Sequence, residues 1–111
     1  MEVTELKVAQ AVSDALQAAS EATQKIVTRN GNNFDCCGFA WVTTFEKGTS
    51  KLVRELKKHG FKKAYGGGYQ LWNPSKSYTQ SMYALEEGAR AAANVLTERL
   101  GVEFYAQSRM D

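Results

Sequence analysis

The chain has little of the chemistry that metal sites and disulfide bonds require. Its 111 residues include one histidine, one proline and two cysteines. Cys36 and Cys37 are adjacent, and together with His59 they fall short of the four ligands of a structural zinc site. Adjacent cysteines also seldom pair, because a disulfide between them distorts their shared peptide bond. We therefore expect reduced thiols in a cytoplasmic protein, with one thiol in the core and the other exposed on the opposite side of a strand.

Long hydrophobic runs are absent as well. No apolar stretch approaches the ~20 residues that a membrane-spanning helix needs. The first residues carry neither the basic start nor the apolar segment of a secretory leader, so we expect none. The net charge of +2 is small, whereas a dedicated duplex-DNA binder is usually more basic.

Catalytic motifs are missing too. His59 stands at the end of a lysine-rich segment, with no Ser or Cys placed near it by a recognised spacing. Glu86 and Glu87 are neighbours on an expected helix, so their carboxylates diverge. The reactivity of either cysteine depends on surroundings that a sequence does not describe. We predict a protein that binds rather than catalyses, and that uses no cofactor.

Three segments have the apolar periodicity of helices. The longest covers 2–28, where a stripe rich in alanine recurs every three or four residues. A shorter helix is expected from about 49 to 59 and ends at Gly60. The last runs from about 79 to 100 and ends at Gly101.

Strand-like segments lie between the helices. Residues 38–45 form one expected strand, with large rings on one face. Residues 61–65 and 69–72 form a hairpin, because three glycines join them and glycine readily adopts the positive φ of a tight turn. A half-buried strand is expected over 102–107, with its buried positions at Val102, Phe104 and Ala106.

These elements predict a single α+β domain over 1–111. After the N-terminal helix (1–30), residues 36–111 follow the βαββαβ order called ferredoxin-like, a four-stranded antiparallel sheet with two helices on one face. Three places are open to the extra amphipathic helix: over the open face, beside the other helices, or against a second copy. Its alanine-rich stripe leads us to expect a homodimer.

The stretch 36–45 is the most informative in the chain. It nearly spells the RNA-recognition signature, with a glycine followed by the alternating rings of Phe39 and Trp41. Cys37 replaces the basic residue of that signature, and Thr44 replaces its last aromatic. In such domains exposed rings stack bases, whereas the interpretation that we favour places these rings in the core between sheet and helices. A nucleic-acid interface would use Phe39, Trp41, Lys62 and Lys63.

A second candidate site combines a glycine-rich turn with a polar loop. The turn exposes backbone N–H groups beside lysines, which suits a phosphate. The loop after Trp72 places an amide and hydroxyls beside a ring that stacks a base. Arginines on the last helix and the last strand would pair with an anion. The ligand-binding residues expected on this basis are Tyr65, Gly67, Tyr69, Trp72, Asn73, Ser75, Arg90 and Arg109.

Each part of this second site also has a simpler interpretation. The turn would be an ordinary hairpin with solvated lysines, and Asn73 and Ser75 would cap the loop backbone. Arg90 would be a solvated or salt-bridged surface residue. The tail 107–111, with Arg109, would be a frayed end.

The motifs CGFAWV, YGGG, WNPS, GARAA and SRMD are spread over roughly 36–111. Together they resemble a family of small, mostly uncharacterised bacteriophage proteins. The resemblance implies a protein that acts in the cytoplasm of an infected bacterium and works by binding. Inhibition of a host enzyme and sequestration of a defence signal are two such roles.

We therefore predict a non-enzymatic phage protein that binds an anionic, nucleotide-like ligand and counters host defence by sequestering a signal molecule. The alternatives are a module that binds single-stranded nucleic acid and a protein inhibitor of a host enzyme. Solvent exposure of Phe39 and Trp41 would favour the nucleic-acid module. A concave pocket lined by Trp72 would favour ligand binding over the inhibitor.

Overall fold

The computed structural model describes residues 4–30, 37–79 and 81–110. Within these ranges the chain forms three helices and four strands. In chain order they are α1 (Glu5–Asn30), β1 (Gly38–Thr44), α2 (Lys51–Lys57), β2 (Lys62–Lys63), β3 (Tyr69–Trp72), α3 (Met82–Leu100) and β4 (Tyr105–Met110).

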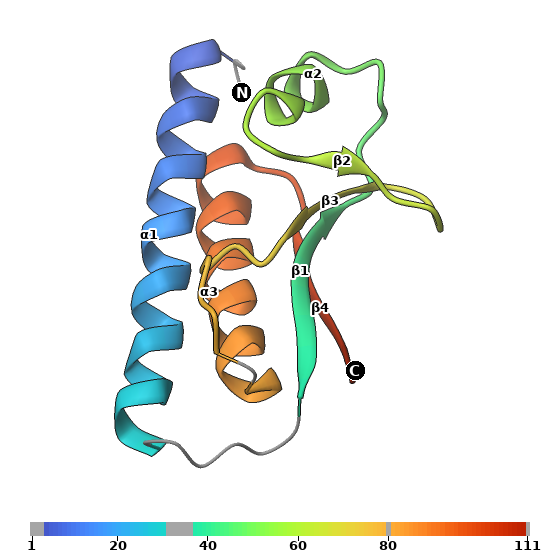
Figure 1. Cartoon of the computed structure of the whole chain (residues 1–111). Coiled ribbons are helices and arrows are strands. Elements are labelled where there is room, and N and C mark those ends of the chain that lie inside the picture. The colour runs from blue at the N-terminus through green and yellow to red at the C-terminus, as the bar shows by residue number, and fades with distance from the viewer. Residues whose placement is uncertain (1–3, 31–36, 80, 111) are drawn as a thin grey trace.

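The strands form one open antiparallel sheet in the order β2-β3-β1-β4. The predicted α+β class and the four-stranded antiparallel sheet are confirmed. β1 and β3 are the two central strands, with Trp41 opposite Trp72. Figure 1 shows α1 and α3 on one side of this sheet, and the described elements leave its other side uncovered.

The N-terminal helix packs beside α3. The two helices are antiparallel. Near the start of α3, Thr23 Oγ1 donates to Ala84 O over 2.8 Å, and near the end of α3, Arg99 Nη1 donates to Asp14 Oδ2 over 2.6 Å. The expected alanine-rich stripe is buried within the chain, since Ala15 is inaccessible to solvent. This stripe therefore no longer supports the predicted homodimer.

Small residues bring α1 and α3 close together. A Cβ added at Gly88 of α3 would run into Thr23 Oγ1 and would lie 3.0 Å from the carbonyl oxygen of Ala19. Neighbouring positions on both helices are buried alanines. The two helices are therefore closely packed against each other along this stripe.

The short helix α2 lies at the end of the sheet that is nearest to the N-terminus of α1 (Figure 1). Ser50 is its N-cap, and the Ser50 side chain accepts from Val53 N. α3 covers the sheet as expected, whereas α2, with seven residues, closes the end of the core with Leu52 and Leu56.

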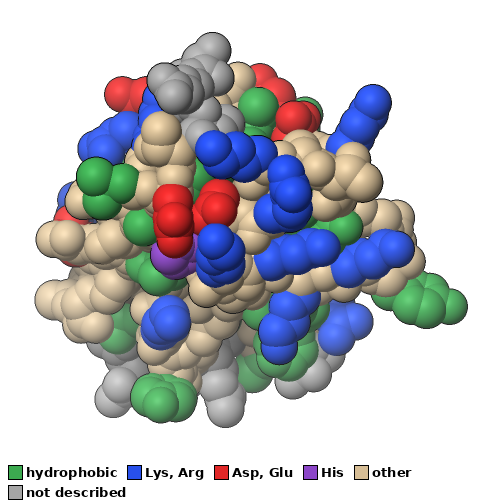
Figure 2. Space-filling model, turned by 90° about the horizontal axis from the view of Figure 1, so that it is seen from above, with side chains coloured by type: hydrophobic (Ala, Val, Ile, Leu, Met, Phe, Trp, Pro, Cys, Tyr) green, Lys and Arg blue, Asp and Glu red, His purple; other side chains and the backbone are tan. Residues whose placement is uncertain are grey.

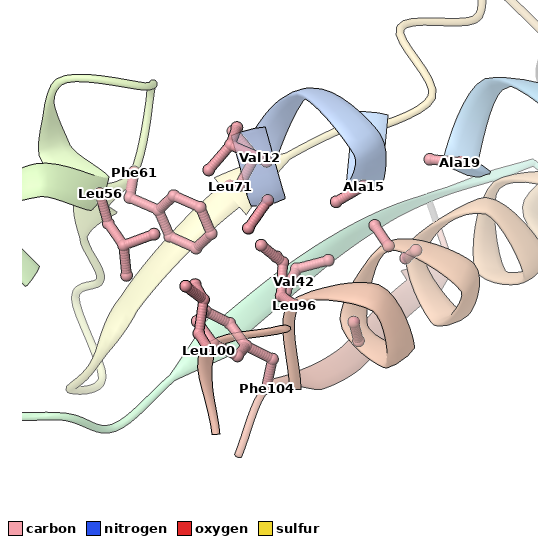
Figure 3. Packing of buried hydrophobic residues seen from close by; sticks show 14 of the residues in the cluster. Val12, Ala15, Ala19, Val42, Leu56, Phe61, Leu71, Leu96, Leu100 and Phe104 are labelled. Carbon is pink, nitrogen blue, oxygen red and sulfur yellow. The ribbon is translucent and has the colours of Figure 1, made fainter. Parts of the chain in front are cut away.

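One hydrophobic core connects these layers. Phe61 and Phe104 meet edge to face, with ring centroids 6.0 Å apart. Figure 3 shows the buried side chains of α1, α3 and the strands converging in the space between the helices and the sheet. The labelled residues include Val12, Val42, Leu56, Leu71, Leu96 and Leu100.

The last strand differs from its prediction. β4 is Tyr105–Met110 rather than 102–107, and it pairs along all of its length with β1. Gly101 ends α3 in the left-handed conformation, and Phe104 then fills the core while its N–H donates to Thr97 Oγ1 over 3.0 Å. Residues 101–104 are thus occupied by the end of α3 and by the core, and β4 begins only at Tyr105. The interpretation of the tail as frayed is wrong for 107–110, which pair with β1.

Replacing Gly88 with alanine should test the close approach of α1 and α3. An alanine gains up to about 1 kcal/mol in helix propensity over glycine. The overpacking against Thr23 and Ala19 should outweigh this gain and lower the free energy of unfolding by about 1–3 kcal/mol. Urea denaturation measures the change. Gly66→Ala is the matched control, because no atom lies within 4 Å of the added Cβ, and its stability should change by less than about 1 kcal/mol.

The Asp14–Arg99 ion pair should make the stability of the fold depend on pH. Hydrogen bonds from Arg99, and then from Gln10, hold the pKa of the Asp14 carboxyl below its ordinary value of 3.8. The stability that the pair contributes is therefore present above that ordinary value and is lost as pH falls through the lower folded value. NMR titration of Arg99→Gln should show the Asp14 pKa rising toward 3.8. Arg90→Gln, which removes a different surface pair with Glu87, should leave the Asp14 titration unchanged.

Candidate functional site

The uncovered face of the sheet carries the large rings of β1. Phe39 is 38% exposed, whereas its neighbour Ala40 is 2% exposed and Val42 is fully buried on the helix side. Trp41 shares the uncovered face with Phe39, because side chains alternate along a strand. The interpretation that placed these rings in the core is therefore wrong. The closely packed helical layer accepts the small side chains of β1 and leaves the rings outside.

Three rings form a cluster on the two central strands. We call Phe39, Trp41 and Trp72 the aromatic platform. Trp41 and Trp72 stack with centroids 4.8 Å apart and planes 25° apart. Phe39 meets Trp72 edge to face at 6.1 Å. Trp72 is 44% exposed, so the platform offers ring surface to solvent.

Arg109 of β4 lies over the platform. It is paired in register with Phe39, and its guanidinium carbon is 5.6 Å from the Phe39 ring centroid and 6.0 Å from that of Trp72. A guanidinium at this range gains about 0.5–1 kcal/mol from the ring quadrupole at an exposed site. Arg109 forms no ion pair with a carboxylate of the described residues, so its charge remains for a ligand.

Gln107 fixes the orientation of Trp41. Its Oε1 accepts from Trp41 Nε1 over 2.9 Å and from Thr43 Oγ1 over 2.7 Å. Gln107 belongs to the tail 107–111 but is not among the residues that the sequence predicts to bind a ligand. The signal that finds it is the β1–β4 register, which places Gln107 directly opposite Trp41.

The rest of the uncovered face is basic, aromatic or uncharged. The strand register places Thr43 between Gln70 and Tyr105, and Lys62 of the edge strand lies beyond Gln70. Tyr105 in turn meets the exposed ring of Phe45 at 6.0 Å. None of the four strands contains an acidic residue. This face can stack planar groups and attract anions.

A hollow of about 250 Å³ adjoins the platform at the start of the loop between β3 and α3. Phe39 and Trp72 form part of its wall. Its lining residues are Cys37, Gly38, Phe39, Ala40, Trp72, Asn73, Ser77 and Thr79.

The polar loop residues beside this hollow mainly support the loop. Asn73 Nδ2 donates to Ser77 O over 3.1 Å, and Asn73 Oδ1 accepts from Ser75 Oγ over 3.3 Å. Ser75 is buried, at 5% exposure. Asn73 therefore caps the loop backbone, as the simpler interpretation expects, whereas Ser75 donates to the Asn73 side chain instead of the backbone.

The structure separates the other residues of the expected ligand site. Tyr65 and Gly67 are exposed at the tip of the hairpin. Tyr69 is three residues from Trp72 and thus faces the opposite side of the sheet, with Lys57 Nζ 5.1 Å from its ring centroid. Arg90 lies on α3 and pairs with Glu87 at 2.7 Å. Trp72 and Arg109 remain together, and Asn73 follows Trp72 in the chain.

The expected cysteine arrangement is described only in part. Cys37 is exposed, and Cys36 lies outside the described residues. The described part of the chain contains no group of three or more His, Cys, Asp or Glu residues that could hold a metal ion. No helix within the described ranges is both long and apolar enough to cross a membrane.

Replacing Gln107 should loosen the platform. In Gln107→Ala, Trp41 and Thr43 lose their shared acceptor, and the free energy of unfolding should fall by about 1 kcal/mol. The indole N–H resonance of Trp41 should also exchange faster with water in an NMR experiment. Gln70→Ala is the control on the same face, because its side chain has no hydrogen-bond partner among the described residues. Equal effects of the two variants would show that Gln107 has no special role.

Comparison of the chain with protein-family models, with curated proteins and with solved structures finds no match.

Proposed function

We propose that the uncovered face of the sheet binds single-stranded nucleic acid. Bases would stack on Phe39, Trp41 and Trp72, and phosphates would contact Arg109 and Lys62. The observation that carries this proposal is the exposed ring cluster on two adjacent central strands, with Arg109 above it.

The physical basis of the proposal is stacking. Each base stacked on an aromatic side chain contributes about 1–3 kcal/mol, and every base offers a flat face. In a duplex the bases are already stacked on one another, so a flat platform favours unpaired strands. The Arg109 guanidinium suits a phosphate, since its planar fork donates two parallel hydrogen bonds.

The near-match of β1 to the RNA-recognition signature supports the same function. A Cβ at Gly38 would lie 2.6 Å from the carbonyl oxygen of Arg109, so the position requires glycine for β4 to pair closely. Thr44, which replaces the last aromatic of the signature, is fully buried on the helix side. Its replacement therefore removes no ring from the uncovered face.

We also propose that residues 36–111 are a ferredoxin-like core. The element order β1-α2-β2-β3-α3-β4, with β1 and β3 central, supports this topology. RNA-recognition domains likewise stack bases on the central strands of a four-stranded sheet.

Replacement of Trp72 tests the proposed function. Fluorescence anisotropy of labelled single-stranded RNA and DNA of about 12 nucleotides gives the affinity of each protein. Trp72→Ala should weaken binding by about 5–150-fold, the equivalent of 1–3 kcal/mol for one lost stack. Tyr83→Ala is the matched control: this exposed ring lies on α3, on the helix side of the sheet, and its loss should leave affinity unchanged.

Equal affinity of wild type and Trp72→Ala for every oligonucleotide would falsify the assignment of the platform. Preference for a duplex over single strands would also contradict it, because paired bases cannot spread over the rings.

A nucleotide-like small molecule is the second candidate ligand, and the hollow beside Trp72 favours it. In this form the protein would sequester a signal molecule, with Trp72 stacking its base and Arg109 binding its phosphate. Competition separates the two candidates. A mononucleotide that displaces the oligonucleotide at similar concentration supports the small ligand, whereas affinity that rises with oligonucleotide length supports the polymer.

A further inference from the structure

Half of the positive charge of the chain is concentrated in one segment. Residues 46–63 contain seven of the fourteen Lys and Arg residues but only two of the twelve Asp and Glu residues. The segment thus has a formal charge of +5, and the remainder of the chain is negative, although the whole chain carries only +2. The small net charge of the whole chain therefore conceals an uneven distribution of positive and negative charge along it.

The fold brings these charges to one end of the molecule, which we call the basic end. Figure 2 shows Lys and Arg side chains gathered over this end, where α2 and the hairpin lie. The basic end consists of Lys47, Lys51, Arg54, Lys57, Lys58, Lys62 and Lys63.

Most of these cations have no anionic partner in the described chain. Lys58 binds Glu55 at 3.0 Å and approaches Glu5 at 3.9 Å, and Lys57 lies over the Tyr69 ring. The other five are exposed and form no ion pair with a described carboxylate. Unpaired like charges held together repel one another, and a polyanion would relieve that repulsion.

The basic end is continuous with the proposed binding face. Lys62 pairs in register with Gln70, which pairs with Thr43, so Lys62 lies on the uncovered face. Strands are about 4.8 Å apart, and Lys62 is therefore roughly 10 Å from β1. Lys63 points to the opposite side of the same edge strand, toward Tyr69 and α2. The positive charge thus passes from the face, around β2, onto α2.

We propose that the basic end binds the sugar-phosphate backbone of a strand whose bases lie on the aromatic platform. This inference rests on the proposed function and extends its site across the edge of the sheet. The bases would occupy β1 and β3, and the chain of phosphates would continue past Lys62 to Lys63, Lys51 and Arg54. The ligand class is a single-stranded RNA or DNA of several nucleotides, because a mononucleotide on the platform cannot also reach α2.

Salt dependence tests this extension. Each phosphate contact on a single strand steepens the dependence of log affinity on log salt by about 0.7. The variant Lys51→Gln/Arg54→Gln/Lys63→Gln leaves the platform, Lys62 and Arg109 intact. Its slope should be shallower by about 2. Its affinity should be about 100-fold weaker at about 0.1 M salt and should approach the wild-type value near 1 M.

The control removes the same number of charges elsewhere. Lys25→Gln/Arg29→Gln/Arg90→Gln neutralises three exposed cations on α1 and α3, on the covered side of the sheet. It has the same net charge as the test variant, and it should keep the wild-type slope. Trp72→Ala should do the opposite of the test variant: it should lower affinity at every salt concentration with little change in slope.

The two proposals fail in different ways. If wild type binds no single-stranded oligonucleotide, the proposed function is wrong, and the extension falls with it. If wild type binds and the test variant keeps the wild-type slope and affinity, the extension is wrong and the platform alone is the site. If test and control variants lose affinity equally, net charge rather than the basic end is responsible, and the extension is again wrong.

Discussion

The close packing of α1 on α3 is the constraint on which the rest of the structure depends. Gly88 and the alanines around it let the two helices approach until a single methyl group would clash. This compact layer is matched on the sheet by Ala40 and Val42, which are small enough to lie beneath α3. Because a strand alternates, the bulky partners of those residues must face the other way. Exposed rings on β1 are thus a consequence of how tightly the helices pack.

Much of the fold follows from local patterns in the sequence. The periodicity of α1 and the end of α3 at Gly101 both depend on residues near in sequence, and both are found in the segments where the pattern predicts them. The face of β1 that is buried does not follow in this way. An alternating strand has two faces, and the space that the helices leave for its side chains decides which face is covered. Large aromatic residues suggested the core because they bury the most area, but the space between β1 and α3 is filled by the smaller Ala40 and Val42.

The candidate site was predictable in parts, for reasons of geometry. Trp72 and Arg109 belong to strands that pair with β1, so the fold brings them to Phe39. Tyr69 shares a strand with Trp72, but the odd spacing sends it to the helix side. Gln107 has no chemical signature in a sequence, and only the register with Trp41 reveals its role. Residues that act through pairing across strands are therefore the ones that sequence patterns miss.

The placement of the tryptophans has a spectroscopic consequence. The chain has two tryptophans, and both belong to the stacked pair on the outer face of the sheet. Buried tryptophans commonly report on the integrity of a protein core, but none is present in this core. The near-ultraviolet absorption and emission of the indole rings therefore arise from the exposed surface alone. Their signal will follow occupancy and solvation of that surface, while the buried rings of Phe61 and Phe104 are the aromatic groups that report on the core.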